Sequence, residues 1–456
     1  MEKAGVLEKP PVSKEQPVVN KPRNIPSIVA MVGVGLLSVL MLTEVFISNP
    51  CQVGPPGRFE DFEKGADAGT FLTVERSLDH GLFEHYGLVT MTNGKVYTSH
   101  CGMNGILPGI LIRLTGKSMA EFVPFYYRFT SFMLALGLTL FALVLIREFG
   151  WAAGIVFLLL VPCADWIVFA GRNISYLFYF YVFPFFAAWL LYPRVQSGRM
   201  KMWAFLSIIG ALVFLKATAG YEFITNVILG ATVAPLYYGV SQKRSWQEIS
   251  KSMAKVVAVG VFAFLMAATV NLLQNAAYYG SLSKGFQAIA QKAAARTMGG
   301  KDSSFEGSGG NDSAPADLPV SRILHGYMTF PGASLPLGDR QPRIYLTLFT
   351  FFSSVWVLGL MALVDGRVFP VFGKLRAPLV GFALALVWSL VCTFTWPLVA
   401  KGFMYHHMHI AAMAFYVTYM IMALAGFGIL VSLVLRQAFY FIVNGYKRGS
   451  LTASTD

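Results

Sequence analysis

The sequence predicts an all-α polytopic membrane protein with about ten transmembrane helices and both termini in the cytoplasm. Composition is the first reason: 55% of the 456 residues are hydrophobic and only 13% are charged, against about a quarter charged in soluble domains. The second reason is that apolar runs of the ~20 residues needed to cross a bilayer recur along the whole chain. These runs lack the alternation of strands, so we expect helices, which satisfy their own backbone groups in lipid.

Taken in order, the apolar runs predict ten spans. They lie at residues 25–48, 122–146, 151–170, 174–193, 202–218, 221–239, 253–274, 343–364, 377–399 and 409–434. The first run is too long for a signal peptide and has no clear small-residue cleavage site, so it is expected to remain as a span. No internal repeat, interrupted helix or mid-membrane polar residue is evident, and a transporter usually has these features.

The polar segments divide the chain into a membrane domain and two tails. Residues 1–24 are polar and rich in Pro and Lys, which predicts a disordered cytoplasmic tail. Residues 25–434 form the predicted transmembrane domain, and residues 435–456 form a second cytoplasmic tail. Two predicted outer loops are long, at 49–121 and 275–342, whereas the other loops are short.

The distribution of charge predicts the orientation. The segments expected in the cytoplasm carry 19 of the 36 basic residues and 7 of the 23 acidic residues. Their net charge is +12, which leaves +1 of the total of +13 for the rest of the chain. Basic residues collect on the cytoplasmic side of membrane proteins, where they attract anionic membrane lipids. No soluble basic domain accompanies this charge, so nucleic acid is not an expected partner.

The first outer loop is expected to be structured. Its apolar residues after Asp67 are spaced three and four apart, at Phe71, Val74, Leu78 and Leu82. This spacing predicts an amphipathic helix that stops near Gly81. A second amphipathic stretch surrounds residues 106–114, and a helix-like stretch, 284–296, follows the seventh span. The sequence therefore predicts helices that lie outside the membrane-crossing set.

Two of the four cysteines, Cys51 and Cys101, fall in this first outer loop. If that side is oxidising, a disulfide between them would close the loop. Two unpaired thiols are the alternative, because the sequence does not give their separation in space. Cys163 and Cys392 lie in predicted spans and are expected to be buried apolar residues.

Ionisable residues within the spans or next to them gather near the predicted outer ends. They are Glu44, Arg128, Asp165, Arg172, Lys216, Glu222, Lys401, His406, His407 and His409. Charges within spans are expensive and usually functional, although long side chains near helix ends can also reach water at little cost. Acidic side chains reach water less easily, so Glu44, Asp165 and Glu222 favour a polar cavity open to the outside.

These features resemble the GT-C class of membrane glycosyltransferases, which includes the protein O-mannosyltransferases and the aminoarabinose transferase. The resemblance rests on a first span followed by a long outer loop in which Asp67 precedes an amphipathic helix ending in Gly81. A Tyr/His/Gly-rich segment, 97–105, then precedes the second span. Many members carry paired acidic residues at the start of this loop. Here Asp67 is followed by Ala68 and the acidic pair is at 60–61, so Asp61 is the alternative catalytic residue.

The resemblance implies transfer of a sugar from a polyprenyl-phosphate carrier to an acceptor at the exocytoplasmic face. Asp67 would be the general base, and helix N-capping is the competing explanation for an Asp at this position. Cationic side chains would stabilise the lipid phosphate leaving group, and the candidates are Arg128, Arg172, Lys216 and Lys401. The residues expected around the cavity are Tyr97, His100, Asp165, Glu222, His406 and His409.

A divalent metal ion is the one cofactor that the sequence suggests. His406 and His409 would share a face of a helix and could bind such an ion with a carboxylate from another loop, whereas interfacial histidines are the commoner case. The alternative functions are a polysaccharide polymerase or ligase, and a transporter or lipid flippase. The expected location is a bacterial plasma membrane, with the active site facing the periplasm or the outside.

Overall fold

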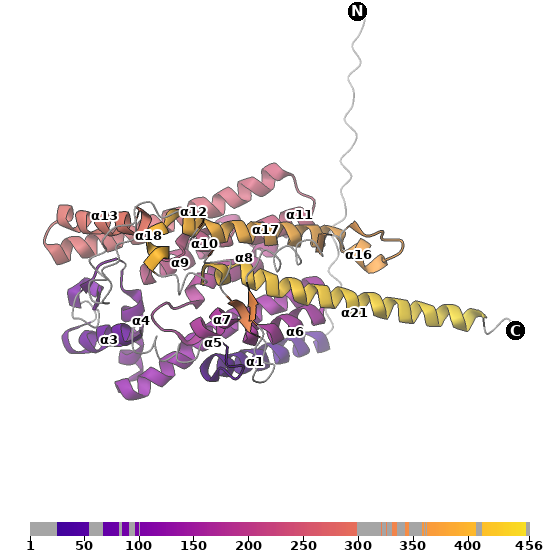
Figure 1. Cartoon of the computed structure of the whole chain (residues 1–456), viewed down its shortest axis with the longest axis horizontal. Helices are drawn as coiled ribbons and strands as arrows, with labels where there is room; N and C mark the ends of the chain where they lie inside the picture. Colours follow the sequence, from indigo (N-terminus) through magenta and orange to yellow (C-terminus); the bar gives the residue numbers. More distant parts are fainter. Residues whose placement is uncertain are drawn as a thin grey trace, which may run out of the picture.

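Helices make up most of the computed structural model (Figure 1). It describes residues 25–53, 67–81, 84–90, 96–99, 101–298, 363–406 and 413–452, with the shorter pieces 321, 325, 331–334, 343–345, 358–359 and 361. The two small sheets in these residues have two strands each. The predicted all-α class is therefore confirmed. Asp61, His100 and His409 lie outside the described residues, as does the predicted tail 1–24.

Seven of the described helices are long and apolar enough to cross a membrane, when α10 and α11 are counted as one. They are α1 (Ile25–Ser48), α5 (Met119–Phe149), α9 (Met202–Ala219), α10 (Ile224–Gly230) with α11 (Val233–Ser241), α12 (Trp246–Tyr279), α17 (Arg376–Val399) and α21 (Tyr419–Thr452). Each overlaps a predicted span. The protein is therefore an integral membrane protein with several spans.

A pair of helices with a sharp bend between them is an eighth candidate for a span. Helix α6 (Trp151–Leu160) continues into a 3-10 turn (Val161–Cys163), and α7 (Asp165–Arg172) then leaves at 75°. Pro162 lies in the first turn of the 3-10 helix. Proline has no backbone N–H and its ring clashes with the preceding turn, so it favours a break. The expectation that the chain has no interrupted helix was wrong here, whereas the span predicted at 151–170 stays a prediction.

The other two predicted spans are not established. Helix α8 (Tyr179–Gln196) occupies the fourth and is largely buried, but it is not among the seven apolar helices. Its tyrosines and prolines, together with Arg194 and Gln196, lower its hydropathy. Of the eighth, 343–364, only parts are described, and its first residues form strand β4 (Arg343–Tyr345) paired with β3 (Pro331–Ser334). A helix beginning at 343 is therefore wrong. The count of ten stays a prediction.

The remaining elements gather at two opposite ends of the bundle (Figure 1). One end, here the α3 end, carries α3 (Ala68–His80), α4 (Met103–Thr115), α13 (Leu282–Met298) and α18 (Lys401–His406). The other, here the α16 end, carries α16 (Pro370–Lys374) and the last turns of α21. Short pieces complete the chain: a 3-10 turn (Glu84–Gly87), the strand pair β1 (Val89–Thr90) and β2 (Val96–Tyr97), and α20 (Met413–Val417).

The helices predicted outside the membrane-crossing set are confirmed. Helix α3 ends beside Gly81, whose φ of +107° suits glycine. Helix α4 packs against α3 through Gly105, where an added Cβ would lie 2.5 Å from the Thr73 methyl group. Helix α13 covers the predicted stretch 284–296. At the opposite end of the chain, the segment predicted as a tail after residue 434 continues α21 as far as Thr452.

Candidate functional site

The Asp67 carboxylate is buried at the α3 end, one residue before α3 begins. Its Oδ1 accepts hydrogen bonds from the backbone N–H of Ser175 (3.2 Å) and from the Ser175 hydroxyl (3.0 Å). Its Oδ2 accepts from the Tyr127 hydroxyl at 3.2 Å. The Ser175 hydroxyl also hydrogen-bonds Thr70 on α3 at 3.0 Å. We call Asp67, Thr70, Tyr127 and Ser175 the carboxylate centre.

These contacts join three separate parts of the chain. Asp67 belongs to the loop after α1, Tyr127 to α5, and Ser175 to the turn that follows α7. The carboxylate oxygens bond across the fold rather than to the first turn of α3, so N-capping does not account for this Asp. Asn104 of α4 also donates to the Ser175 carbonyl (3.4 Å). The turn after α7 is thus held against both loop helices.

Burial raises the pKa of Asp67 from 3.8 to about 7. Removing a carboxyl from water disfavours its charged form, and this effect outweighs the hydrogen bonds from Ser175 and Tyr127, which lower the pKa. The group therefore exchanges a proton close to neutral pH. Such a pKa is what a general base or acid needs at that pH.

Arg172, predicted to bind phosphate, lies beside this centre. Its guanidinium carbon is 5.6 Å from the centroid of the Tyr127 ring, a cation–π distance. Its Nη1 donates to the Ile47 carbonyl (3.2 Å) near the end of α1, and the Arg172 carbonyl accepts from Thr130 (3.3 Å). The side chain is half-buried. A cation thus stands next to the tyrosine that binds Asp67.

A second polar cluster brings Lys216 and Glu222 together. Lys216, at the end of α9, is fully buried; its Nζ donates to the Gly220 carbonyl and lies 3.9 Å from the centroid of the Tyr181 ring. The Glu222 carboxylate folds onto the same turn, where a Cβ on Gly220 would lie 2.2 Å from its Oε2. Glycine at position 220 is what leaves room for this carboxylate.

Helix α13 completes this cluster from the far side. Arg296 pairs with Glu222 (Nη1 to Oε1, 3.7 Å) and donates through Nη2 to the Tyr97 hydroxyl. Lys292, one turn earlier, lies 5.0 Å from the centroid of the Tyr97 ring. Burial raises the pKa of Tyr97, so its hydroxyl stays protonated. We call Tyr97, Lys216, Glu222, Lys292 and Arg296 the basic centre, because it holds three cations and one carboxylate.

Tyr176 connects the two centres. It follows Ser175 directly, and its hydroxyl lies within electrostatic range of Glu222, Tyr97 and Asp67. Its backbone N–H is fixed by the Asn173 side chain at 2.9 Å. The α3 end thus holds a carboxylate whose pKa is about 7 and a cluster with excess positive charge, and Tyr176 lies between them.

Other predicted site residues are not joined to these centres by any contact we can describe. The Arg128 side chain is exposed. Asp165 begins α7 and is buried near Cys163 and Tyr416. Lys401 is half-buried on α18, which packs against α13, the helix that carries Arg296.

The predicted metal site stays a prediction. His409 lies outside the described residues, and of His406 only the backbone, in α18, is described. Within the described part of the chain, no three His, Cys, Asp or Glu side chains are grouped as metal ligands. Asp61 and His100 likewise lie outside the description.

The predicted disulfide between Cys51 and Cys101 is wrong for this structure, because both residues are free thiols. Cys101 faces α12 and donates its Sγ–H to the Ala267 carbonyl at 3.2 Å. Burial there raises its pKa to about 12. Cys51 instead hydrogen-bonds Cys163, at the break between α6 and α7. The loop is held to the bundle by other contacts, such as that of Asn275 on α12 with the Thr98 carbonyl (3.0 Å).

Ser175, Tyr127 and Arg296 were not predicted. Ser175 ends an Asn-Ile-Ser sequence at 173–175 that played no part in the predicted site, and Tyr127 is the neighbour of the predicted Arg128. Arg296 had a usable signal, since it is a cation near the end of the helix-like stretch in the second long loop. Its partner Tyr97 is 199 residues away in sequence, so no local pattern joins them.

Comparison with known proteins adds no relative: no protein-family model, no curated protein and no solved structure matches this chain.

Proposed function

We propose that this chain is a membrane glycosyltransferase of the GT-C type, which moves a sugar from a polyprenyl-phosphate carrier to an acceptor. The observation that carries the proposal is the buried Asp67 carboxylate, whose pKa of about 7 accompanies a cluster of cations at the same end of the bundle. A base works best when its pKa lies near the working pH. Cations stabilise the charge of a departing phosphate.

In the proposed reaction, an acceptor hydroxyl oxygen bonds to the anomeric carbon while the bond from that carbon to the phosphate oxygen breaks. Asp67 takes the hydroxyl proton, and the bonding electrons leave with the lipid phosphate. We assign Lys216 and Arg296 to that phosphate, because burial strengthens the attraction between charges. Arg172 is a further cation, and it lies beside Tyr127 of the carboxylate centre.

We further propose that the α3 end faces the exocytoplasmic side of a bacterial plasma membrane, in a bundle of ten spans. The support is the charge at the opposite end. The turns there carry Arg147, Arg199, Lys243 and Lys374, and short loops with such residues stay in the cytoplasm. A carrier whose phosphate lies at headgroup level would meet the basic centre from within the membrane.

The first test is transfer by purified protein in liposomes, offered a panel of radiolabelled polyprenyl-phosphate sugars and an acceptor extract. Release of lipid phosphate is measured for wild type, Asp67→Asn, Asp61→Asn and the control Asp79→Asn, an exposed position on α3. Loss of a general base lowers rates by about 10²–10⁴-fold. We expect that loss in Asp67→Asn alone, and a wild-type rate that rises with pH through about 7. If only Asp61→Asn loses release of lipid phosphate, the glycosyltransferase proposal stands and Asp61 replaces Asp67 as the general base.

The basic centre gives a second test in the same assay. Arg296→Gln removes the cation that pairs with Glu222, and we expect phosphate release to fall at least tenfold with the fold retained in a thermal melt. Lys284→Gln is the matched control, since Lys284 is exposed on the same helix. Equal rates for the two variants would remove Arg296 from the proposal. Assays with and without EDTA test the predicted divalent ion.

One observation favours a flippase as the second candidate, namely the 75° break between α6 and α7. Discontinuous helices are common where transporters bind substrates. If wild-type protein binds the carriers but releases no lipid phosphate with any acceptor extract, transfer is excluded. Movement of a fluorescent polyprenyl phosphate between leaflets is then the measurement to make.

A further inference from the structure

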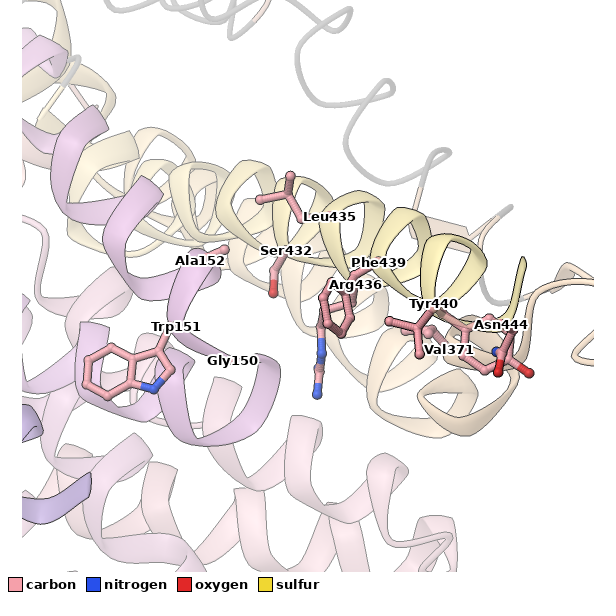
Figure 2. A pocket seen from close by; sticks show the side chains of 11 residues that line it. Gly150, Trp151, Ala152, Val371, Ser432, Leu435, Arg436, Phe439, Tyr440 and Asn444 are labelled. Carbon is pink, nitrogen blue, oxygen red and sulfur yellow. The ribbon is translucent and has the colours of Figure 1, made fainter. Parts of the chain in front are cut away.

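A groove of about 810 Å³ opens at the α16 end, far from both polar centres. It lies between the start of α6, helix α16 and the last turns of α21 (Figure 2). Most of its lining is apolar or aromatic, including Trp151, Val371, Phe439 and Tyr440. Arg436 is the one side chain with a charge at neutral pH among the residues that line it. The groove therefore offers one positive charge in an apolar channel.

The Arg436 side chain extends from α21 toward Gly150, as Figure 2 shows. Its Nη1 donates to the Phe149 carbonyl at 3.3 Å, and Ser432 donates to the same oxygen at 2.7 Å. A guanidinium has five N–H donors, and this is the one hydrogen bond of Arg436 within the described part of the chain. The side chain is exposed, so its other donors can reach a ligand in the groove.

The groove is continuous with the membrane-facing surface of α21. Phe427, Val431, Val434 and Leu435 are exposed apolar residues on the same helix, and Leu435 also lines the groove. An acyl chain can therefore pass from the bilayer into the groove without crossing water. Trp and Tyr side chains, here Trp151 and Tyr440, are typical of the level at which lipid headgroups lie.

We propose that this groove binds an anionic phospholipid, with the headgroup phosphate on Arg436 and an acyl chain along the apolar face of α21. Charge complementarity selects this occupant, because a cation in an apolar groove suits a ligand with one anionic group and a long apolar tail. Arginine forms paired hydrogen bonds with phosphate oxygens. The site is independent of the proposed transferase, which uses the opposite end of the bundle.

Native mass spectrometry of delipidated protein tests the proposal. Phosphatidylglycerol and phosphatidylcholine with the same acyl chains are titrated into wild type, Arg436→Gln and Arg436→Lys. The matched control is Arg199→Gln, an exposed arginine in the turn between α8 and α9, at the same end. A charge-assisted hydrogen bond corresponds to about a tenfold change in affinity or more. We expect phosphatidylglycerol to bind wild type at least tenfold more tightly than phosphatidylcholine.

Arg436→Gln should remove this preference, whereas Arg436→Lys should keep much of it and Arg199→Gln should keep all of it. A photoactivatable phosphatidylglycerol should label peptides that contain residues 432–444 in wild type, which holds even if Arg436→Gln fails to fold. The proposal is overturned if the two lipids bind wild type equally well. The proposal is also overturned if Arg436→Gln and Arg199→Gln lose the preference for phosphatidylglycerol equally, or if the photoactivatable lipid labels only other helices.

Discussion

Replacing Asp67 by Asn should make the protein more stable at high pH while leaving it unchanged at low pH. The structure holds this carboxyl buried, with a pKa raised from 3.8 to about 7. Asn keeps the size and can keep the geometry, because its Oδ1 can still accept from Ser175 and its amide can donate to the Tyr127 hydroxyl. The substitution therefore removes the ionisation and little else.

The sign follows from proton binding. Between pH 3.8 and about 7 the unfolded chain has lost the Asp67 proton while the folded protein retains it, so stability falls as pH rises. Below pH 3.8 the folded and unfolded states both hold the Asp67 proton, so stability does not depend on it. Above about pH 7 both states have lost the proton, and the decrease in stability is complete. A pKa raised from 3.8 to about 7 corresponds to a loss of about 4 kcal/mol in the free energy of unfolding. Roughly 3 kcal/mol of this loss occurs between pH 5 and pH 8.

The assay is thermal unfolding in detergent at pH 5, 6, 7 and 8, for wild type, Asp67→Asn and the control Asp79→Asn. Asp67→Asn should melt within a degree or so of wild type at pH 5 and a few degrees above it at pH 8. Asp79→Asn should follow wild type throughout, since Asp79 is exposed. A constant difference between wild type and Asp67→Asn at all four pH values would refute the account of Asp67.

Two further predictions concern packing and the thiols. Gly105→Ala places a methyl group 2.5 Å from the methyl group of Thr73. Overpacking of this kind costs about 1–3 kcal/mol, so the melting temperature should fall. Adding Thr73→Ser to the same chain removes the Thr73 methyl group and should restore much of the lost melting temperature. Because Cys51 hydrogen-bonds Cys163, a mild oxidant such as diamide should join these two, which mass spectrometry of peptides detects. Cys163→Ser should abolish the product, and a bond from Cys51 to Cys101 in wild type would contradict the structure.

The membrane helices could be predicted because hydropathy is a local property of the chain. Helices α1 and α5 lie where the apolar runs are, since each such run must satisfy its backbone alone in lipid. The break after α6 could not be predicted in this way. Pro124, Pro184 and Pro397 all lie inside continuous helices, so a proline in the sequence does not by itself locate a break.

The candidate site also combines local features with long-range ones. Asp67 could be named as a candidate from the sequence because it directly precedes an amphipathic helix, which is a local feature of the chain. Its partner Ser175 lies 108 residues away, and Arg296 lies 199 residues from Tyr97. Hydrogen bonds over such separations depend on how the helices pack, which a single sequence does not reveal. The sequence indicates which residue types could take part in the proposed chemistry, and only the packing of the helices decides which of them lie close together.

The bend between α6 and α7 explains how the carboxylate centre forms. Gly171 on α7 packs against Phe46, and Arg172 donates a hydrogen bond to the Ile47 carbonyl, so α7 lies against the last turns of α1. Here the break turns the chain so that the residues after α7 lie against α3, and the Ser175 N–H meets Asp67. The bend therefore brings the Ser175 N–H and hydroxyl to the buried carboxylate, and under the proposed function its role is to position the general base.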